Sequence, residues 1–331
     1  MASLGRATIR NVAQAVGVDP STVSRILRNP GGRKTLTRER VLAAVQELGY
    51  RPNMLAQSLT TSLAPIIPLL VPDVSNWFFA EIARGAEEAA WSAGYSLILC
   101  NTGRSANREG VYLETLAALQ VPAVIVAPNS ESSALAIQRF IAVMPVVTID
   151  RLVAGLDLPR GTVDNYLGGR LAAQHLVEFG HRQIACIAGP ADASTAQERV
   201  QGYVDVLKEA GLVPAVITGG FTTKDGVRAA RAFLKRAPRP SAVVCANDLC
   251  AVAFIHELET NGVHVPEDVS VIGYDDLPLA ALVRPTLTSI YQPARRLGAL
   301  GVELALGRTK LRSPVRLRPH LVARDSTARA T

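Results

Sequence analysis

Residues 8–25 read Thr-Ile-Arg-Asn-Val-Ala-Gln-Ala-Val-Gly-Val-Asp-Pro-Ser-Thr-Val-Ser-Arg, and this stretch decides the fold of the N-terminal part. Thr8 is a helix N-cap residue, the apolar side chains after it repeat at helical spacing, and Gly17 ends that helix. Asp19 then caps a second helix with Pro20 at its first position, where the missing N–H costs nothing. Two short helices joined by a tight glycine turn predict a helix-turn-helix.

A third amphipathic segment at residues 37–48 completes this head. Thr37 is its expected N-cap and Gly49 ends it. Its apolar stripe consists of Val41, Leu42, Val45 and Leu48. Together with Val23, Ile26 and Leu27 of the second helix, this stripe predicts three small helices around one shared core.

The second helix exposes hydroxyl and guanidinium groups opposite its apolar stripe. Arg25 is the best candidate for a base reader, because its planar fork matches the two acceptors of guanine, a pairing worth about 1–3 kcal/mol of discrimination. The alternative is a solvated face with a salt bridge, yet the head holds only three carboxylates. The predicted DNA contacts of the head are Thr8, Pro20, Ser21, Thr22, Ser24, Arg25 and Arg28.

Charge is unevenly distributed along the chain. Residues 1–62 carry nine Lys/Arg and three Asp/Glu, residues 63–307 carry 19 and 24, and residues 308–331 carry seven and one. The net charges of these blocks are +6, −5 and +6. A basic head on a mildly acidic body is consistent with binding a polyanion. Charge alone does not distinguish this from a basic surface that is only solvated. We interpret the basic C-terminal stretch as such a surface.

The composition of the 331 residues, 48% hydrophobic and 19% charged, is that of a globular protein of two or three domains. No apolar run is long enough for a membrane helix, and the first residues lack a signal sequence, so we expect a cytoplasmic protein without membrane contact. The four cysteines lie singly in apolar stretches and are expected to be reduced core residues. We expect neither a metal site nor a cofactor.

From about residue 63 onward, short apolar runs alternate with helical stretches, which is typical of parallel sheets covered by helices on both faces. About 270 residues in this rhythm predict two open α/β lobes with a cleft between them. The predicted strands are residues 66–71, 96–100, 123–127, 145–149, 183–188, 242–246 and 269–273, and clear helical stretches are 79–93, 167–179, 198–210 and 249–261.

Polar residues follow several of these strands, where ligands bind in open α/β sheets. They are Asp73, Asn76, Asp150, Arg151, Asn247, Asp248, Asp275 and Asp276. An isolated Asp or Asn at such a place is often only a loop cap, but four strand ends with polar groups favour a polar ligand. Arg199 adds a forked donor, and Trp77, Phe78 and Phe221 add flat apolar faces, a mixture that suits a sugar or a nucleoside.

The order of residues in the head resembles that of the lactose/galactose repressor (LacI/GalR) family of bacterial transcription regulators. The matching motifs are Thr-Ile-Arg-Asn-Val-Ala at 8–13, Gly-Val-Asp-Pro-Ser-Thr-Val-Ser-Arg at 17–25, Thr-Arg-Glu-Arg-Val-Leu at 37–42 and Glu-Leu-Gly-Tyr-Arg-Pro-Asn at 47–53. The resemblance implies that the segment behind the head folds into a hinge helix on DNA. Leu59 would then be the wedge that opens a base step in the minor groove.

The resemblance continues through the body, in motifs such as Val-Pro-Asp-Val-Ser-Asn at 71–76, Cys-Ala-Asn-Asp at 245–248 and Val-Ile-Gly-Tyr-Asp-Asp at 271–276. It implies a helix-turn-helix domain at residues 1–52, a hinge and linker at 53–62, and a two-lobed, periplasmic-binding-protein-like α/β body at 63–331. Lobe 1 would comprise about 63–161 and 293–318, and lobe 2 about 162–290 and 319–331. The implied effector residues are Asn76, Phe78, Arg151, Arg199, Asn247 and Asp275, and we add Trp77, Asp150, Phe221 and Gln292.

Two residues depart from the family pattern. Trp77 stands where proline is most frequent, so a large ring is expected at the mouth of the cleft. Pro68 interrupts the first strand of the body where glycine is usual, and the lost backbone donor predicts an edge strand or a locally irregular one.

These features together predict a homodimeric, nucleoid-associated repressor that binds a palindromic operator and is controlled by a small polar effector, in the first place a sugar. The last four residues follow Arg-Asp-Ser-Thr at 324–327, too few for an added tetramerising helix, so a dimer is expected. An activator or corepressor-dependent regulator with a nucleoside or purine effector is the alternative within this fold. An exported solute-binding protein would need a signal sequence, and an enzyme would need a catalytic motif that the chain lacks.

Overall fold

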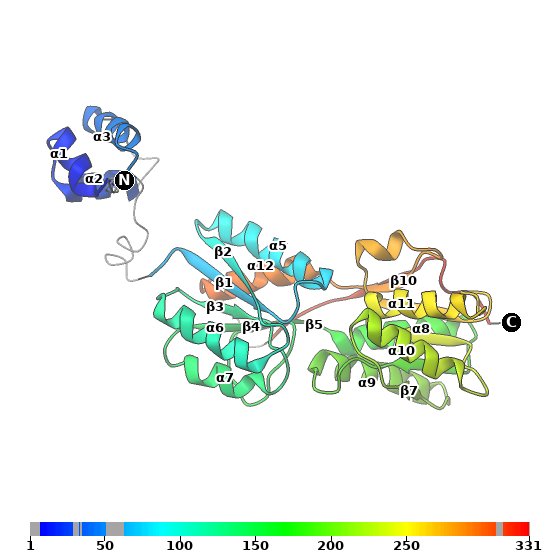
Figure 1. Ribbon diagram of the computed structural model, residues 1–331. Coiled ribbons are helices and arrows are strands. Elements are labelled where there is room, and N and C mark those ends of the chain that lie inside the picture. The colour runs from blue at the N-terminus through cyan, green and yellow to red at the C-terminus, as the bar shows by residue number, and fades with distance from the viewer. Residues whose placement is uncertain (1–6, 29–32, 34, 51–62, 309–313, 331) are drawn as a thin grey trace, which may run out of the picture. The chain divides into compact units, whose positions relative to one another are not determined.

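The computed structural model describes residues 7–28, 33, 35–50, 63–308 and 314–330 (Figure 1). The chain forms two compact units, residues 1–64 and 65–331, which we call the head and the body. The head is all-α and the body is α/β, as the sequence predicted.

The head consists of α1 (Ile9–Val16), α2 (Pro20–Arg28) and α3 (Leu36–Glu47). Thr8 and Asn11 form a capping box at the start of α1: Thr8 N donates to Asn11 Oδ1 at 2.9 Å, and Asn11 N donates to Thr8 Oγ1 at 3.4 Å. Gly17 ends the helix with φ of 72°, a left-handed conformation that glycine adopts without steric cost. The shared core contains Val12, Ala13, Val16, Val23, Val41 and Ala44.

The prediction for the third helix was wrong in two details. Thr35, not Thr37, is the N-cap, because the Thr35 hydroxyl accepts from Arg38 N at 3.2 Å while Thr37 already lies in the first turn. Leu42 and Leu48 are 39% and 40% exposed. Leu42 directly follows the buried Val41, and neighbouring residues on a helix point about 100° apart, so both cannot face the core.

Lobe 1 of the body has a six-stranded sheet in the order β11-β5-β4-β3-β1-β2, and all neighbouring strands are parallel. Its strands are β1 (Ile66–Val71), β2 (Ser96–Asn101), β3 (Val124–Val126), β4 (Val146–Ile149), β5 (Arg160–Val163) and β11 (Val315–Leu317). The helices α5 (Trp77–Ser92) and α12 (Ala294–Ala305) share one buried cluster on this sheet. The helices α6 (Ala106–Ala118) and α7 (Ser133–Phe140) share a second one.

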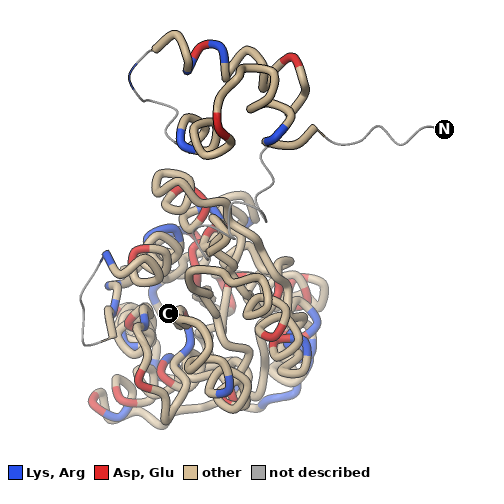
Figure 2. Tube along the Cα trace, turned by 90° about the vertical axis from the view of Figure 1, so that its left-hand side faces the viewer, with Lys and Arg blue, Asp and Glu red and all other residues tan. Residues whose placement is uncertain are grey.

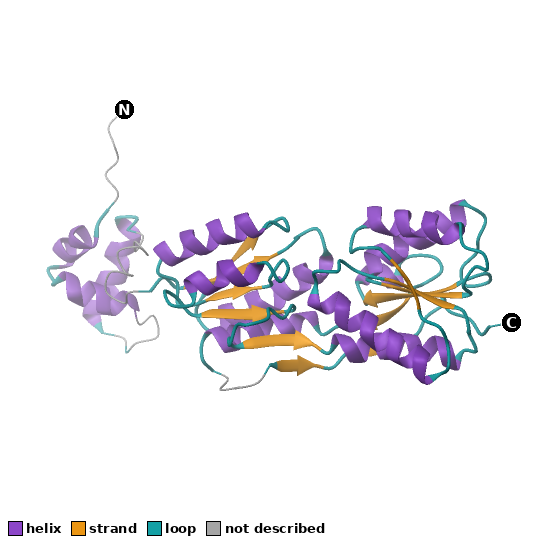
Figure 3. Cartoon of the chain, turned by 90° about the horizontal axis from the view of Figure 1, so that it is seen from below, coloured by secondary structure: helices purple, strands orange, loops and turns teal. Residues whose placement is uncertain are grey.

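Lobe 2 has a six-stranded sheet in the order β12-β10-β9-β8-β6-β7. Its strands are β6 (Ile184–Ile187), β7 (Ala215–Ile217), β8 (Ala242–Cys245), β9 (Ser270–Asp275), β10 (Thr288–Tyr291) and β12 (His320–Val322), and β12 is antiparallel to β10. The helices α8 (Asn165–Glu178) and α9 (Ser194–Glu209) pack in one cluster, and α10 (Thr223–Leu234) and α11 (Asp248–Thr260) in another. A 3-10 turn, η1 (Pro278–Ala281), follows β9. Figure 3 shows helices on both sides of each sheet.

The chain passes between the lobes three times, at residues 163–165, 291–294 and 317–320. The carboxyl ends of β4 and β9 therefore face one cleft, and this is what places residues far apart in sequence at one site. Charged residues of both signs are interspersed along the body (Figure 2).

Pro68 does not mark an edge strand, so that prediction was wrong. β1 pairs with β2 on one side and with β3 on the other, and it runs without interruption. Leu70 O accepts from Ala127 N on the β3 side, and alternate residues of a parallel strand face the same neighbour, so the Pro68 nitrogen also faces β3. The β1–β3 pairing begins only at Leu69, so the missing donor falls just outside the ladder.

All four cysteines are free and buried. Among the described residues, no helix is long and apolar enough to cross a membrane, and no group of three or more His, Cys, Asp or Glu side chains is placed to hold a metal ion.

Candidate effector site and nucleic-acid interface

A cleft lies between the two lobes and opens to solvent, and about 370 Å³ within it, part of which is open solvent, is not filled by protein atoms. Its walls come from the carboxyl ends of strands in both sheets and from the helices that follow them. The lining residues are Pro72, Asn76, Phe78, Phe79, Arg104, Asp150, Arg151, Thr195, Arg199, Phe221, Asn247 and Asp275. Eight of the ten predicted effector residues are in this set.

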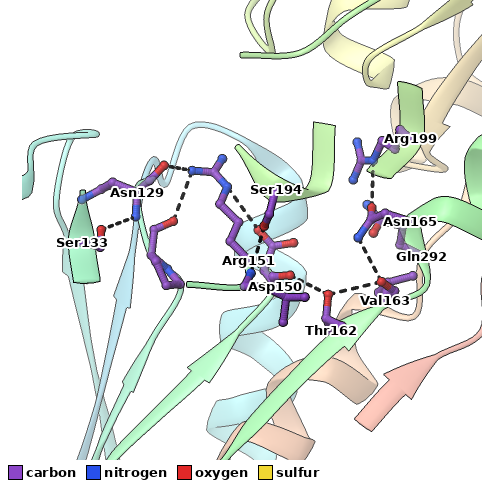
Figure 4. Close-up of polar contacts among 12 residues, drawn as sticks. Asn129, Ser133, Asp150, Arg151, Thr162, Val163, Asn165, Ser194, Arg199 and Gln292 are labelled. Carbon is purple, nitrogen blue, oxygen red and sulfur yellow. Dashed lines mark hydrogen bonds and ion pairs between the residues drawn. The ribbon is translucent and has the colours of Figure 1, made fainter. Parts of the chain in front are cut away.

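Lobe 1 contributes side chains from the start of α5, which follows β1, and from the loop after β4. Asn76 caps α5 by accepting from Phe78 N at 3.0 Å, which turns the Phe78 ring toward the cleft wall, edge-on to Phe79. Asp150 directly follows β4, with φ of 67°, and is buried together with Arg151. The Arg151 guanidinium donates to the carbonyls of Pro128, at 3.2 Å, and Asn129 (Figure 4).

The loop that holds Arg151 is itself fixed by buried hydrogen bonds. The Asn129 side chain accepts from Thr102 Oγ1 at 2.7 Å and donates to Glu109 at 2.9 Å, while Asn129 N donates to Ser133 Oγ at 3.1 Å. Each bond is buried, so moving the loop would leave polar groups without partners. The direction of Arg151 is therefore set before any ligand binds.

Lobe 2 contributes the ends of β8 and β9 and the first turns of α9. Asn247 caps α11 by accepting from Cys250 N at 3.0 Å, and its amide nitrogen donates to Phe221 O at 3.1 Å. Arg199 donates to Asn165 Oδ1 at 2.9 Å and to Ala246 O at 2.8 Å, and its guanidinium carbon lies 3.6 Å from the centre of the Tyr274 ring. Arg199 is thus held as firmly as Arg151 (Figure 4).

The two lobes meet around Phe221. The guanidinium carbons of Arg151 and Arg199 each lie 5.8 Å from the centre of this ring, one from each lobe. Beside it, Leu152 N of lobe 1 donates to Ser194 Oγ of lobe 2 at 2.9 Å, and Arg316 of lobe 1 pairs with Glu198 of lobe 2 at 3.2 Å. The cleft is therefore closed by contacts between the lobes.

Burial controls the electrostatics of the cleft. It raises the pKa of Asp150, against the opposing effect of Arg151 and Arg199, and it raises the pKa of Asp275 to about 7, against Arg199 and a hydrogen bond from Gln292. Burial also lowers the pKa of Arg151. These carboxyl and guanidinium groups have lost most of their water, so a ligand that supplies hydroxyl groups replaces hydrogen bonds at each of them.

Two predicted effector residues do not line the cleft. Trp77 is the first residue of α5 and is 46% exposed, and its ring is not part of the cleft wall. Gln292 is buried behind the wall, where its Nε2 donates to Asp275 Oδ1 at 2.6 Å and its Oε1 has no partner among the described residues. Sequence reasoning missed Pro72, Phe79, Arg104 and Thr195.

In the head, Ser21 and Arg25 of α2 are exposed, while Pro20, Thr22 and Ser24 are half-buried around the fully buried Val23. Thr8 is exposed, and its hydroxyl belongs to the capping box of α1. Arg28 is the last residue of α2, but its side chain and the whole of Leu59 lie outside the described residues. The described side chains on the outward face of α2 therefore include hydroxyl groups and Arg25, which are groups that bind phosphates and base edges.

Two family profiles match this chain. Residues 8–53 match "Bacterial regulatory proteins, lacI family", and residues 64–305 match "Periplasmic binding proteins and sugar binding domain of LacI family". The head and cleft thus define a transcriptional regulator with a ligand-binding body. The chain belongs to the LacI family of bacterial regulatory proteins.

Relatives and solved structures agree with this assignment. The chain is 38% identical to the ribose operon repressor of Bacillus subtilis over 303 residues, which covers 91% of each protein. It is 36% identical to the HTH-type transcriptional repressor PurR of Photobacterium profundum over 328 residues, covering 97% of this chain and 98% of that one. The lac repressor dimer bound to operator and the anti-inducer ONPF is similar with a TM-score of 0.88 and 27% identity, covering 98% and 99% of the two chains.

Proposed function

We propose that this regulator is a homodimeric repressor whose affinity for a palindromic operator is controlled by a sugar bound in the cleft, and that the sugar is a pentose of the D-ribose type. The observation that carries the proposal is the donor and acceptor set of the cleft. Two buried carboxyl groups, Asp150 and Asp275, face two buried guanidinium groups, Arg151 and Arg199.

A small sugar fits this set because each hydroxyl group both donates and accepts hydrogen bonds. Asp150 and Asp275 accept, Arg151, Arg199 and Asn247 donate, and the rings of Phe78 and Phe221 cover the apolar faces of a sugar ring. A relative named for a ribose operon, aligned over 91% of this chain, supports a pentose. Gln292 holds Asp275 from behind, so we assign it a supporting contact.

For DNA binding, we propose that α2 enters the major groove, with Arg25 as the base reader and Ser21, Thr22, Ser24 and Arg28 as phosphate or base contacts. Thr8 and Pro20 bind at the helix starts, and Leu59 opens a base step in the minor groove. Two heads related by a two-fold axis require a palindromic operator. The site of action is then the nucleoid in the cytoplasm, and the proposal assigns no catalytic step to the chain.

The switch that we propose is a change in cleft closure. Closure moves lobe 1 of one subunit against its partner, and the segment at residues 53–62 then folds or melts on DNA. The sugar changes operator affinity only by as much as its own affinity differs between the two arrangements. The alternative effector is a purine that strengthens operator binding, and a relative named PurR favours it. We prefer a sugar because both lobes place side chains in the cleft that can hydrogen-bond to hydroxyl groups.

Thermal shift is the first test, because a ligand that binds only the folded protein raises its melting midpoint. The screen contains D-ribose, other pentoses and hexoses, disaccharides, nucleosides, hypoxanthine and guanine. We expect D-ribose or a closely related pentose to give the largest shift and to weaken operator binding. A larger shift with a purine base, together with stronger operator binding, would replace the proposed effector and reverse the direction of control.

A further inference from the structure

Asp248 is a buried carboxylate that lies beside the effector cleft without lining it. It is the first residue of α11, directly after the cleft residue Asn247, and it is 0% exposed. A Cβ atom built on Gly273 of β9 would lie 2.2 Å from Asp248 Oδ1, so glycine is required there for the carboxylate to rest against the strand. Asp248 therefore faces the end of β9, where Asp275 is located.

This carboxylate accepts hydrogen bonds that hold the short turn after Asp275. Asp248 Oδ2 accepts from Leu277 N at 2.7 Å, and Asp248 Oδ1 accepts from Ser289 Oγ at 2.6 Å. The same Ser289 Oγ accepts from Asp276 N at 3.1 Å. Asp248 thus holds the amide of Leu277 directly and the amide of Asp276 through the Ser289 hydroxyl.

The turn needs such support, because Asp275 and Asp276 have φ of 111° and 52°. Left-handed conformations are unfavourable for residues with a Cβ, and two in succession persist only where surrounding bonds impose them. This backbone shape directs the Asp275 side chain into the cleft. Among the described residues, that side chain is held by Gln292, at 2.6 Å, and by Arg199, at 4.0 Å.

The next residue on the turn, Leu277, joins lobe 2 to lobe 1. It belongs by chain position to lobe 2 but is 3% exposed within the buried cluster of lobe 1 that includes Val71, Phe78 and Phe79. Phe78 also lines the cleft. One turn therefore carries a cleft residue, Asp275, and a cross-lobe anchor, Leu277, two positions apart.

We propose that Asp248 is a positioning residue: by fixing the turn Asp275–Leu277 it sets the cleft side chain Asp275 and couples the occupied cleft to lobe 1 through Leu277. The expected effect of Asp248 on sugar binding rests on the proposed function. The role of Asp248 in fixing the turn does not, since it concerns the unliganded protein.

The experiment compares full-length Asp248→Ala, Asp248→Asn and Ser289→Ala with the unchanged protein. Tyr203→Phe is the control, because Tyr203 is buried in lobe 2 and its hydroxyl bonds Ile184 O at 2.8 Å, far along the chain from the turn and outside the cleft wall. D-ribose binding is measured by calorimetry, and amide hydrogen exchange is followed in the absence of ligand.

We expect Asp248→Ala to weaken D-ribose binding at least tenfold and to reduce its effect on operator affinity, whereas Tyr203→Phe changes both less than twofold. Asp248→Asn should restore binding to within threefold, because its amide oxygen still accepts from Leu277 N and its NH₂ group donates to Ser289. Ser289→Ala, which keeps the carboxylate, should weaken binding about threefold and remains informative if Asp248→Ala does not fold.

In the exchange experiment the amides of Asp276 and Leu277 should exchange at least tenfold faster in Asp248→Ala than in Tyr203→Phe, and in Ser289→Ala the same should hold for the Asp276 amide, which donates to Ser289 Oγ. Equal protection in all variants, or a loss of ribose affinity that Asp248→Asn does not rescue, would overturn the positioning role. Failure of the unchanged protein to bind D-ribose would overturn the proposed effector instead, and the exchange result would still decide the role of Asp248.

Discussion

The head and the body of this protein use the same kinds of side chain under opposite conditions. Arg25 of the head is exposed, whereas Arg199 of the body is 8% exposed and holds fixed hydrogen bonds. Hydrogen bonds from Ser21 lower the pKa of the exposed Asp19, whereas burial raises that of Asp275 to about 7. The head is suited to a large polyanion reached through solvent, and the body to a small ligand recognised without water.

This difference also explains how the two functions can be separated by mutation. In the proposed function most DNA contacts of the head lie on the outward face of α2, so loss of one side chain there leaves the other contacts in place. The cleft is a network in which each charged group is held by others, so loss of one side chain leaves its partners buried and unpaired. The predictions below test this contrast.

The largest effect is expected for Asp275→Ala. In the proposed function Asp275 accepts hydrogen bonds from the sugar, and loss of one partner of a buried, charged contact costs about 2–5 kcal/mol, so sugar affinity should fall by a factor of about thirty or more. Calorimetric titration with the effector found in the thermal-shift screen measures this. Operator affinity without effector should stay within about twofold, and a parallel loss of DNA binding would contradict the separation of the two units.

Arg25→Ala should act in the reverse sense. Loss of one bidentate base contact costs about 1–3 kcal/mol, so affinity for a selected operator should fall about tenfold to a hundredfold while affinity for random DNA changes little. Fluorescence anisotropy on both DNAs gives the ratio. Arg10→Ala, an exposed arginine on α1, is the control and should affect both DNAs equally. Unchanged discrimination in Arg25→Ala would remove it from the readout face.

The pKa of Asp275 predicts a smaller effect on stability. Its carboxyl group binds a proton at about pH 7 in the folded protein but near its ordinary value of 3.8 when unfolded, so the folded state loses stability as the pH rises from 4 through 7. Asp275→Asn removes this loss. Its melting midpoint should exceed that of the unchanged protein by at least about 2 °C at pH 8, with no gain at pH 4. A gain that does not depend on pH would show that Asp275 does not titrate in this range.

Trp77→Ala should have the smallest effect on the effector. The Trp77 ring is 46% exposed and outside the cleft wall, so sugar affinity should change less than about threefold. The same calorimetric titration measures it. A tenfold loss would show that the ring closes over the ligand and belongs to the site after all.

The parts of the structure that the sequence predicts are those with local causes. The starts of α1 and α2 follow from Thr8 and from Asp19-Pro20, because a cap acts within one turn. Asn76, Asp150, Asn247 and Asp275 are predicted for the cleft because they follow apolar runs, and the ends of parallel strands meet. Thr37 was wrong as the expected cap of α3, because a second threonine two residues earlier, Thr35, takes that position.

The parts of the structure that the sequence does not predict depend on tertiary packing. Arg104 and Thr195 line the cleft, but no sequence pattern near them distinguishes them from surface residues. The strands β5, β7, β10, β11 and β12 span three or four residues each and give no clear period, and none was predicted. Trp77 was expected at the mouth of the cleft from its place in the family motif, but Asn76 and Phe78 at the start of α5 line the cleft and Trp77 does not.

Operator binding of the full-length protein, measured by fluorescence anisotropy during titration with D-ribose, tests the central claim most directly. The DNA is a palindromic site selected by the protein from a random library. The proposed function predicts that saturating D-ribose lowers operator affinity at least tenfold in the unchanged protein and has no effect in Asp275→Ala. Operator affinity that D-ribose leaves unchanged, or that it raises, would contradict the claim.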